Sequence, residues 1–563
     1  MTNTKNLLVV VLGISTVMIA ARGGAAMAMT DTELKSITEQ RLLGDRTGAC
    51  FAVAVIDKTV SRTVVCADPK NLSRISSNSA FEIGSVSKTM TAALLADLIV
   101  QGKASLDDPI SKYLPPDVVV PSFEGKPILI RHLVTHTSGL PVVPDFGTAA
   151  DANNPYVNVD EASLLKTLST ATLKRAPGSE FEYSNYAMML LTSMIAKRAG
   201  ADFETLLQTR LFAPIGMKNS YVNLMPKGVD AVQGHTPNRQ ITAAWTFKTN
   251  VSGVGGVRST LDDVVRYVQA QLGATTSAIS PALKLTQQIV KTEANQTRAM
   301  NWMLGPLDSH FVHAHEGGTG GFSAFTAFDL ETKRGVVILS DTALTSMGGL
   351  STLGNHLVDA RLPLGKPRTV KVADAALLNA LVGQYDAVPG LQLTLSREGN
   401  RLFTQATGQG KFEMGYDSEG DFYPLTFDAL LKVNKLADGR YAVLMMQGGG
   451  AIPLKKIEPK TAANSAVEKM SEPQLRANSG TYSLVPGFDL KVFVEGGKLM
   501  AQATGQGAFE IEAKGKDRFA ADAYGIEIQF ERGAVAATSG VAGDTVKSLA
   551  LLQGGKTMRG DKK

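Results

Sequence analysis

The sequence predicts an α/β domain over residues 29–365, an antiparallel sheet with flanking helices and a helical lobe, followed by two small antiparallel β-barrels. Three observations support this prediction. Strand-like segments stand at both ends of the first region, with helical segments between them. Beyond residue 365, long helical patterns give way to short alternating strands and glycine turns. The later region also contains an internal repeat.

Length and composition place the chain among soluble, multidomain proteins. At 563 residues it exceeds the size of one hydrophobic core, so about two to four domains are expected. Hydrophobic residues make up 44% and charged residues 19%, as in ordinary globular proteins. The formal net charge is +5, and the sequence has no basic stripe with interleaved aromatic residues. A nucleic-acid partner is therefore not expected.

The first 28 residues have the pattern of a secretory signal peptide. Lys5 supplies a positive start, residues 7–20 form an apolar run too short to span a bilayer comfortably, and Ala26-Met27-Ala28 is a small-x-small cleavage site. Cleavage would remove Lys5 and Arg22, so the net charge would fall from +5 by two, to +3. We expect export to the periplasm or the cell exterior, with no stable membrane insertion after cleavage. An uncleaved membrane anchor is the alternative.

A helix and a hairpin open the α/β domain. Residues 31–43 have an amphipathic helical pattern, and two β-like runs follow at 50–56 and 62–67. The two cysteines of the chain, Cys50 and Cys66, flank these runs. A tight turn around residue 58 would place them opposite each other, about 4.5–5.5 Å apart at Cα, which is within disulfide range. Because export favours oxidation, we predict a Cys50–Cys66 disulfide, with two buried thiols as the alternative.

A candidate nucleophile follows at Ser85-Val86-Ser87-Lys88, just before a helix-forming run over 89–100. A serine hydroxyl holds its proton too tightly to attack at neutral pH unless a base lies within hydrogen-bond reach. Residues i and i+3 share one helix face, so the Lys88 amine would lie beside the Ser85 oxygen and serve as base if burial removes its proton. The alternative is an ordinary N-cap serine with a solvated lysine. A second match, Ser163 with Lys166, lacks this context and is interpreted as chance.

The middle of the domain is rich in helical patterns, and strands return at its end. Helices are predicted over 162–168, 187–199, 203–211, 261–272 and 281–290, strands over 322–329 and 335–340, and a closing helix over 350–359. Strands at both ends favour one antiparallel sheet in which the first and last strands pair. The active site would then lie in the crevice between the sheet and the helical lobe.

Tyr183-Ser184-Asn185 opens a predicted helix after a Pro-Gly turn. A tyrosine phenolate beside a lysine ammonium can share proton transfer, and the Asn185 amide can hold a substrate carbonyl or the Lys88 amine. The pattern alone has little weight, because Tyr-x-Asn also occurs at 156–158 and 221–223. Its place at the start of a helix favours the match at Tyr183.

A glycine-rich segment, His315-Glu316-Gly317-Gly318, supplies the remaining candidates. Glycines permit close backbone approach to a ligand, and the N–H of Gly318 can join that of Ser85 as an oxyanion pair. His315 and Gly317 would line the substrate site, with His315 as an anchor or an acid. Strand alternation would point the Glu316 side chain away from the site.

The other histidines are assigned structural roles. His310 and His313 have the pattern of strand residues with alternating exposure, and His132 and His136 are expected to hold the turn at residues 137–140. A zinc site is not expected, because the sequence has neither a His-Glu-x-x-His motif nor a cysteine cluster.

The region after residue 365 is a tandem duplication. The hexapeptide at 405–410 recurs without change at 502–507, and a Gly-x-Tyr motif at Tyr385 recurs at Tyr482 with the same offset of 97. We assign a first barrel to 366–459, a polar linker to 460–473 and a second barrel to 474–563. Neither copy has a cluster of histidines or acids suited to catalysis, so modules that only add stability are one interpretation and ligand binding is the other.

The three motifs at residues 85–88, 183–185 and 315–317 resemble, in order and spacing, those of class C β-lactamases and the penicillin-recognising serine hydrolase superfamily. Segments at 106–109, 132–140 and 255–260 fit as well. The superfamily includes D-Ala-D-Ala carboxypeptidases, D-aminopeptidases and family VIII-type carboxylesterases, and the C-terminal repeats look like the lipocalin-like barrels of some D-aminopeptidase-type members. One departure stands out: the β-lactamases carry Lys-Thr-Gly, whose lysine anchors a substrate carboxylate, where this chain has His315-Glu316-Gly317, and a histidine of ordinary pKa is mostly neutral at pH 7.

The resemblance implies an exported serine hydrolase that forms an acyl-enzyme on Ser85 and uses no metal or organic cofactor. The site residues it implies are Ser85, Lys88 and Tyr183 for catalysis, Ser85 and Gly318 for the oxyanion, and Asn185, His315 and Gly317 for substrate. The expected partner is a small molecule or short peptide: a peptide with or without D-residues, a small ester or a β-lactam. The alternative is a catalytically silent protein that binds penicillin or cell-wall peptide.

Overall fold

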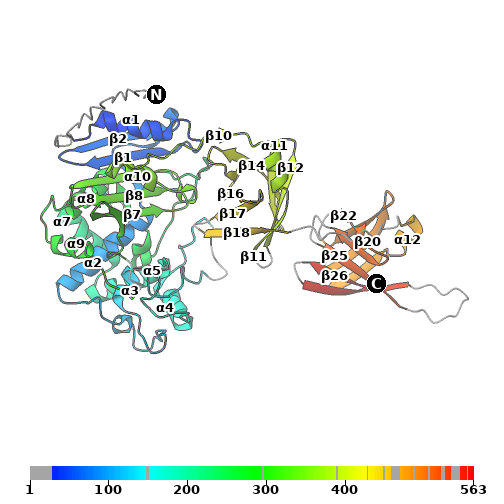
Figure 1. Cartoon of the computed structure of the whole chain (residues 1–563). Coiled ribbons are helices and arrows are strands. Elements are labelled where there is room, and N and C mark those ends of the chain that lie inside the picture. Colours follow the sequence, from blue (N-terminus) through cyan, green and yellow to red (C-terminus); the bar gives the residue numbers. More distant parts are fainter. Residues whose placement is uncertain are drawn as a thin grey trace, which may run out of the picture.

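The computed structural model in Figure 1 has an α/β domain followed by two β-barrels. It describes residues 28–146, 151, 153–293, 297–388, 391–427, 429–447, 450–457, 470–485, 488–504, 508–521, 526–533, 545–553 and 556–563. All but the last residue of the predicted leader, 1–28, and most of the predicted linker, 460–473, lie outside these residues. Within the described part of the chain, no helix combines the length and apolar character needed to cross a bilayer.

A six-stranded antiparallel sheet forms the centre of the α/β domain, in the order β2-β1-β9-β8-β7-β6. Its strands are β1 Cys50–Ile56, β2 Val60–Cys66, β6 Met303–Leu307, β7 His310–Gly318, β8 Ser323–Asp329 and β9 Arg334–Ser340. β1 pairs with β9 from Phe51↔Ser340 onwards, so the first and last strands meet as predicted. Cys50 and Cys66 are directly opposed in the hairpin and are joined by a disulfide.

The two faces of the sheet belong to two hydrophobic cores, as the period of two along a strand requires. On β1, Phe51, Val53 and Val55 pack with α1 (Asp31–Leu42) and α10 (Ser351–Val358), whereas Ala52, Ala54 and Ile56 face the larger core of the helical lobe. That lobe contains α2 Ser87–Val100, α3 Ile130–Val134, α4 Glu161–Thr170, α5 Asn185–Ala199, α6 Phe203–Leu206, α7 Ala213–Ile215, α8 Leu261–Gln271 and α9 Ser280–Thr286. Figure 1 shows α1 beside β2 and β1 at one end of the domain and α2, α3, α4 and α5 of the lobe at the other.

The differences from the expected elements are short segments. The helix predicted over 281–290 ends at Thr286, and the one predicted over 203–211 continues from α6 into a π-helical segment, Leu207–Phe212. A second sheet of three strands, β4 Asp230–Ala231, β3 Ser79–Glu82 and β5 Arg258–Thr260, was not predicted. These strands have two to four residues, too few for a period-2 pattern to stand out in the sequence.

Each C-terminal repeat folds into an antiparallel barrel. The first has the order β10-β14-β13-β12-β11-β18-β17-β16-β15 and closes through a further β14–β15 pairing, and the second, β22-β21-β20-β19-β27-β26-β25-β24-β23, is nearly closed. The elements of the first are β10 Val370–Lys371, α11 Ala375–Leu381, β11 Gly383–Val388, β12 Leu391–Glu398, β13 Arg401–Ala406, β14 Lys411–Asp417, β15 Phe422–Pro424, β16 Leu430–Lys435, β17 Tyr441–Gln447 and β18 Gly450–Lys456. Those of the second are α12 Glu472–Arg476, β19 Gly480–Val485, β20 Phe488–Glu495, β21 Lys498–Ala503, β22 Phe509–Glu510, β23 Glu512–Ala513, β24 Arg518–Ala521, β25 Ile526–Gly533, β26 Thr545–Gln553 and β27 Lys556–Lys562.

The repeated residues occupy equivalent structural positions. The Tyr385 hydroxyl donates to the carbonyl of the residue four positions earlier, and Tyr482 does the same. A lysine ammonium lies over each tyrosine ring, 5.7 Å and 5.9 Å from the ring centroid. The preceding glycine of each Gly-x-Tyr motif has no side chain, and a methyl group there would press on that lysine. Both barrel interiors are filled by hydrophobic side chains.

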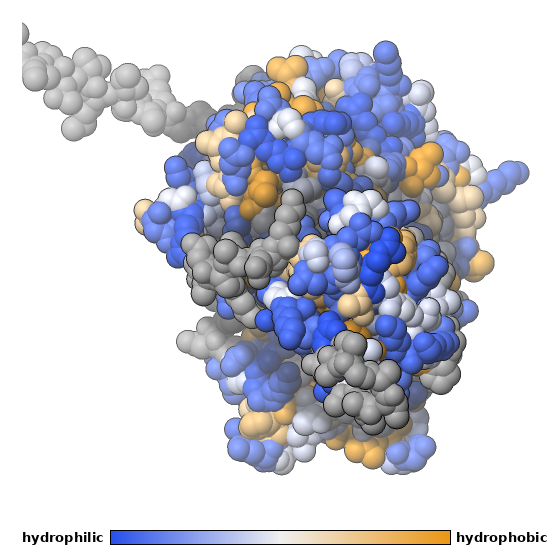
Figure 2. All heavy atoms as spheres, turned by 90° about the vertical axis from the view of Figure 1, so that its right-hand side faces the viewer, coloured by the Kyte–Doolittle hydropathy of each residue, from blue (hydrophilic) through white to orange (hydrophobic). Residues whose placement is uncertain are grey.

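Figure 2 views the molecule from the side of the second barrel. Hydrophobic residues on the coloured part of this face are scattered in small groups among hydrophilic ones. The described residues on this face therefore do not form one broad apolar surface of the kind that marks a protein interface.

Candidate active site

Ser85 lies in a tight turn between strand and helix. β3 leads into a 3₁₀ turn, Gly84–Val86, and α2 begins at Ser87. Gly84 has φ +51°, in the left-handed region that favours glycine. One turn later, the Lys88 Nζ lies 2.8 Å from Ser85 Oγ and donates to the carbonyl of Val254 at 2.7 Å. The predicted i, i+3 pair is thus within hydrogen-bond reach.

The Lys88 side chain is completely buried. Burial lowers the pKa of its amine well below 10.5, because a charged ammonium loses its hydration there. A neutral amine 2.8 Å from the serine oxygen can accept the hydroxyl proton. The residue type, its distance and its charge state therefore all suit a general base.

Tyr183 contacts the same pair. Its side chain hydrogen-bonds to Ser85, and the Lys88 Nζ lies 4.8 Å from the centre of its ring. Burial raises the pKa of the Tyr183 phenol, and the hydrogen bond to Ser85 only partly offsets this. The phenolate–ammonium pair expected from the sequence is therefore disfavoured on both sides, because burial makes both groups neutral. A neutral phenol can still relay a proton, since its hydroxyl both donates and accepts.

His136 holds Tyr183 in place. Their rings stack with centroids 4.3 Å apart. The Nδ1 of His136 accepts from the backbone N–H of Ser184, and its carbonyl accepts from that of Glu182, so His136 contacts the residues on both sides of the tyrosine. His136 has φ +55°, uncommon for a residue other than glycine and typical of positions that the surrounding structure constrains. The sequence predicted a structural role for His136 without indicating this partner.

The end of β7 runs against the nucleophile turn. A methyl group on Gly317 would overlap the carbonyl oxygen of Ile83 and lie 3.0 Å from the Ser85 nitrogen. A methyl group on Gly84 would lie 2.6 Å from the Gly318 nitrogen. Glycine is required on both sides of this contact, and it brings the two predicted oxyanion donors, Ser85 and Gly318, to the same place.

His315 is buried beside Lys88 and His136, and its Nδ1 is bonded to the carbonyl of Glu316 at 2.8 Å. Burial, with a smaller effect of Lys88, lowers the pKa of His315 to about 3. It is therefore neutral at physiological pH and cannot act as a cationic anchor. The Glu316 side chain points to the other face, where it accepts from the backbone N–H of Leu350, as strand alternation predicted.

Buried neutral histidines make stability depend on pH. Burial lowers the pKa of His132 to about 4 and that of His315 to about 3, below the value of about 6.5 in an unfolded chain. Between these limits the unfolded state binds the extra proton, so acidification favours unfolding by about 1.4 kcal/mol per pH unit for each such histidine. We expect His132→Asn to flatten the fall in unfolding free energy between pH 6.5 and pH 4, measured by urea titration. An unchanged slope would contradict the assignment of a neutral, buried His132.

Aromatic side chains wall a small cavity at Ser85. The cavity, about 30 Å³, is lined by Ser85, Tyr156, Asn185, Trp245, Phe247, Val254, Gly255, Gly318 and Thr319. Tyr156 stacks on Phe247 and meets Trp245 edge-on. The Nδ2 of Asn185 donates to the Tyr156 hydroxyl at 3.0 Å, whereas its buried Oδ1 has no hydrogen-bond partner among the described residues. Asn185 thus keeps one acceptor for a substrate N–H.

Sequence reasoning missed the aromatic wall. Tyr156 appeared in the sequence as the start of a chance Tyr-x-Asn match, and it reaches the site through its aromatic contacts and Asn185 instead. Trp245 and Phe247 lie on an irregular segment with no motif. The one available signal was an aromatic pair, Trp245 and Phe247, two residues apart in a stretch without periodic pattern.

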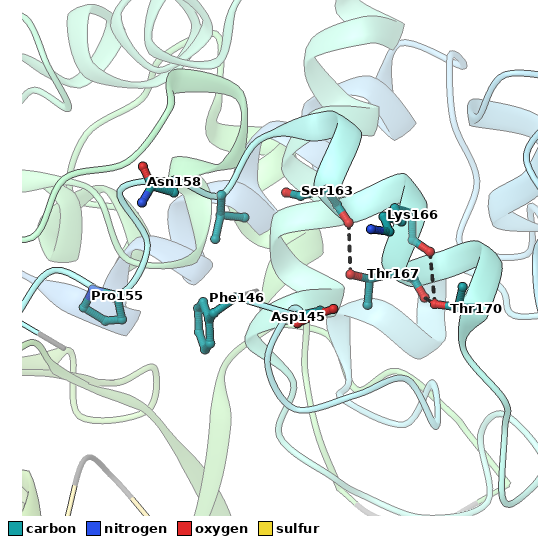
Figure 3. Close-up of a pocket in the computed structure, with 9 residues that line it drawn as sticks. Asp145, Phe146, Pro155, Asn158, Ser163, Lys166, Thr167 and Thr170 are labelled. Atoms are coloured by element: carbon teal, nitrogen blue, oxygen red, sulfur yellow. Dashed lines mark hydrogen bonds between the residues drawn. The ribbon is translucent and has the colours of Figure 1, made fainter. Parts of the chain in front are cut away.

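A second, larger cavity of about 220 Å³ lies beside α4 (Figure 3). Ser163, Lys166, Thr167 and Thr170 of α4 form one side, and Asp145, Phe146, Pro155 and Asn158 form the other. The Phe146 ring meets Tyr156 edge-on at 5.5 Å, so this aromatic pair separates the two cavities. Here Asp160 is the N-cap of α4, and Ser163, in the first turn of the helix, exchanges hydrogen bonds with it, in keeping with the interpretation of Ser163 and Lys166 as a chance motif.

The remaining predicted residues lie away from the site. The His310 Nε2 lies 3.0 Å from the Asp329 carboxylate, and the His313 Nε2 lies 2.9 Å from the carbonyl of Gln287. His132 accepts from the backbone N–H of Leu129. No group of three or more His, Cys, Asp or Glu side chains among the described residues is placed to hold a metal ion.

Comparison with known proteins assigns this arrangement to a family. The family model described as Beta-lactamase matches residues 34–353, more than half of the chain. The chain belongs to the Beta-lactamase family. Its Ser85, Lys88, Tyr183 and His315 all lie within the matched region.

Relatives within the family carry several names. The D-alanyl-D-alanine-carboxypeptidase/endopeptidase AmpH of Escherichia coli (strain K12) is 31% identical over 331 residues, covering 55% of this chain and 83% of that protein. A Beta-lactamase of the same organism is 27% identical over 341 residues, covering 52% of this chain and 83% of that protein. A class C β-lactamase crystal structure, 22% identical, covers 59% of this chain and 99% of its own with a TM-score of 0.50 and shares the fold.

Proposed function

We propose that this chain is a serine hydrolase that cleaves amide or ester bonds through an acyl-enzyme on Ser85. The observation that carries the proposal is the 2.8 Å approach of a completely buried Lys88 amine to the Ser85 hydroxyl. Burying an amine is unfavourable unless its hydrogen bonds are satisfied and its charge is removed. A structural lysine has no need of this environment, whereas a base has.

In acylation, Ser85 Oγ attacks the substrate carbonyl carbon and its proton passes to the neutral Lys88 amine. The oxyanion of the tetrahedral intermediate accepts hydrogen bonds from the backbone N–H groups of Ser85 and Gly318. The bond from carbon to the leaving nitrogen or oxygen then breaks. The leaving group takes its proton from the Lys88 ammonium by way of the Tyr183 hydroxyl, and the acyl group stays on Ser85.

Deacylation reverses these roles with water. The neutral Lys88 amine, through Tyr183, accepts a proton from a water molecule that attacks the acyl carbon. The ester bond to Ser85 breaks, Oγ takes the proton back, and the carboxylic acid leaves. The balance between acylation and deacylation decides whether a β-lactam is hydrolysed or stays bound.

The charge state of the site favours neutral or amine-bearing substrates. Lys88, His136 and His315 are close together, and burial disfavours the charged form of each. A substrate that extends past Tyr156 meets the second cavity, whose lining includes Phe146 and the α4 hydroxyl groups. Remote contacts of this kind can assist catalysis on longer substrates, so short peptides fit the two cavities better than minimal esters do.

A carboxylate-bearing substrate, such as a β-lactam or a peptide ending in D-alanine, is the second candidate. The observation in its favour is Arg298, whose guanidinium lies 3.6 Å from the ring centre of Phe181. Phe181 meets His136 edge-on, and the charge of Arg298 contributes to the low pKa of His136. In this case Arg298 would replace the motif lysine as the anion anchor.

Export is part of the proposed function. The pattern of residues 1–28 supports it, and so does the Cys50–Cys66 disulfide, because such bonds persist in oxidising compartments. The substrate would then be met in the periplasm or outside the cell.

Intact-protein mass spectrometry tests the proposal. The purified chain is mixed in parallel with a fluorophosphonate, a penicillin, an activated short ester and a peptide ending in D-alanine. We expect a fluorophosphonate adduct on Ser85 and turnover of at least one substrate. Ser85→Ala should abolish both, and Ser163→Ala, which removes the serine of the other Ser-x-x-Lys match, should leave the fluorophosphonate adduct unchanged.

The outcomes separate the activities. A lasting penicillin adduct indicates slow deacylation, as in a penicillin-binding carboxypeptidase, and penicillin loss without an adduct indicates a β-lactamase. Ester or peptide turnover with no effect of penicillin indicates an esterase or peptidase. The hydrolase proposal fails if no reagent labels Ser85, in favour of a silent binding protein.

A further inference from the structure

A buried ion cluster joins the α/β domain to the first barrel. Arg46, which precedes β1, and Arg368, which precedes β10, both reach Asp417 at the end of β14, at 3.4 Å and 3.0 Å. Arg368 also pairs with Asp421 at 2.8 Å. Each of these four residues is at most 8% exposed. Figure 1 shows β10 and β14 of the barrel on the side that faces the α/β domain.

From this cluster, one branch leads to the aromatic wall. Arg46 donates to the Asn238 side-chain oxygen at 3.2 Å, and Asn238 donates to two carbonyls of the barrel, those of Phe427 at 2.8 Å and Pro424. Asn238 lies on the segment 232–247. That segment packs on the turn after β7, where the His235 N–H donates to the Gly321 carbonyl at 3.1 Å. Its other end carries Trp245 and Phe247 into the catalytic cavity.

A second branch leads to the proposed oxyanion site. Arg46 and Arg368 both contact Met347, the first at its sulfur (3.4 Å) and the second at its carbonyl oxygen (3.3 Å). Met347 ends a short 3₁₀ helix, η6 Thr345–Met347. The side chain of Thr345 covers Gly318, where an added methyl group would overlap the threonine hydroxyl. The two arginines therefore hold two separate segments that border Ser85.

We infer that the first barrel is a working part of the active site, in which Asp417 positions the aromatic wall and the residues over Gly318 through Arg46 and Arg368. The inference rests on the proposed function for its catalytic consequence. Without the Asp417 carboxylate, two buried guanidinium groups lose a shared partner, and an uncompensated buried charge is strongly unfavourable. The arginines would move toward water and release both segments. Asp417 is thus a positioning residue, far from the reacting atoms.

Asp417→Asn tests this, because it removes the charge and keeps the shape. Asp517→Asn is the matched control, since it breaks the 2.6 Å pair of Asp517 with Arg532 inside the second barrel. Two readouts apply: the rate at which a fluorophosphonate labels Ser85, and acrylamide quenching of tryptophan fluorescence. The chain has two tryptophans, and Trp302 is 1% exposed, so quenching reports mainly on Trp245.

We expect Asp417→Asn to slow labelling about ten- to hundredfold, as misplacement by about 1 Å can, and to increase quenching of Trp245. Asp517→Asn should keep the labelling rate and the quenching of Trp245 within twofold of the unchanged protein. Asp417→Glu should recover part of the labelling rate that Asp417→Asn loses. Asn238→Ala, which removes no charge, should change quenching in the same direction and decides the matter if Asp417→Asn does not fold.

The inference is overturned if circular dichroism shows that Asp417→Asn is folded, and both its rate of Ser85 labelling and its quenching of Trp245 fluorescence equal those of the unchanged protein. Its failure is distinct from that of the proposed function. If Ser85 is never labelled but quenching still rises in Asp417→Asn, the positioning role stands and the hydrolase proposal falls.

Discussion

Lys88→Met should slow acylation of Ser85 by about 10⁴-fold, at the upper end of what a general base contributes, while leaving the stability of the fold nearly unchanged. Methionine has a similar length but no proton acceptor of comparable basicity. The substitution removes the penalty of burying an amine and leaves the Val254 carbonyl without its hydrogen bond. These two effects on stability have opposite signs. Single-turnover labelling and urea denaturation measure the two quantities separately.

The other Ser-x-x-Lys match supplies the control. Lys166→Met on α4 changes the same residue type one turn after a serine, but at an exposed position. We expect no effect on labelling. Acylation within tenfold of the original rate in Lys88→Met would remove Lys88 as the base. If Lys88→Met lowers the free energy of unfolding by more than about 3 kcal/mol, the amine has an essential structural role instead.

Local patterns in the sequence predicted the parts of the site that local geometry determines. Ser85 and Lys88 are three residues apart, in a 3₁₀ turn and in the α2 helix that directly follows it, so helical spacing alone brings them together. The Cys50–Cys66 pair follows in the same way from hairpin register. The pairing of the first and last strands in the sheet of the α/β domain was predictable because both strands had clear patterns, and the second barrel could be inferred from its repeat of the first.

What escaped prediction depends on contacts between distant segments. The aromatic wall combines Tyr156 with Trp245 and Phe247, on two irregular segments about 90 residues apart. Arg46 and Asp417 are separated by 371 positions and belong to different domains. Neither set has a period or spacing that a sequence pattern can show.

The charge states of Lys88, Tyr183 and His315 could only be hypothesised from the sequence. Residue type gives an ordinary pKa, but burial and neighbouring charges decide the shift, and both are properties of the folded chain. For Lys88 the direction matched the hypothesis of a neutral base. For Tyr183 it did not, because burial disfavours the phenolate. Burial thus favours the neutral form of each group, and in the proposed mechanism Lys88 acts as the base and Tyr183 as a relay.

Gly317→Ala should lower the turnover number by at least about 10²-fold, the scale of losing one oxyanion donor, and destabilise the fold by about 1–3 kcal/mol. The added methyl group would overlap the Ile83 carbonyl oxygen and press on the Ser85 nitrogen. The atoms that the methyl group would meet belong to the backbone and cannot move by a change of side-chain rotamer. β7 and the nucleophile turn must therefore separate. The N–H groups of Ser85 and Gly318 then no longer converge on one oxygen.

Gly305→Ala distinguishes this effect from a general cost of alanine in the sheet. Gly305 lies on β6, beside β7, and a methyl group there would meet a single atom within 4 Å, the Val312 carbonyl oxygen at 4.0 Å. Stability and turnover should both stay close to their original values, since surface substitutions usually change stability by less than about 0.5 kcal/mol. If Gly317→Ala loses stability but keeps its turnover number, the contact between β7 and the nucleophile turn is structural and the oxyanion donors lie elsewhere. If both fall together, while Gly305→Ala is silent, catalysis requires the close backbone approach that Gly317 permits.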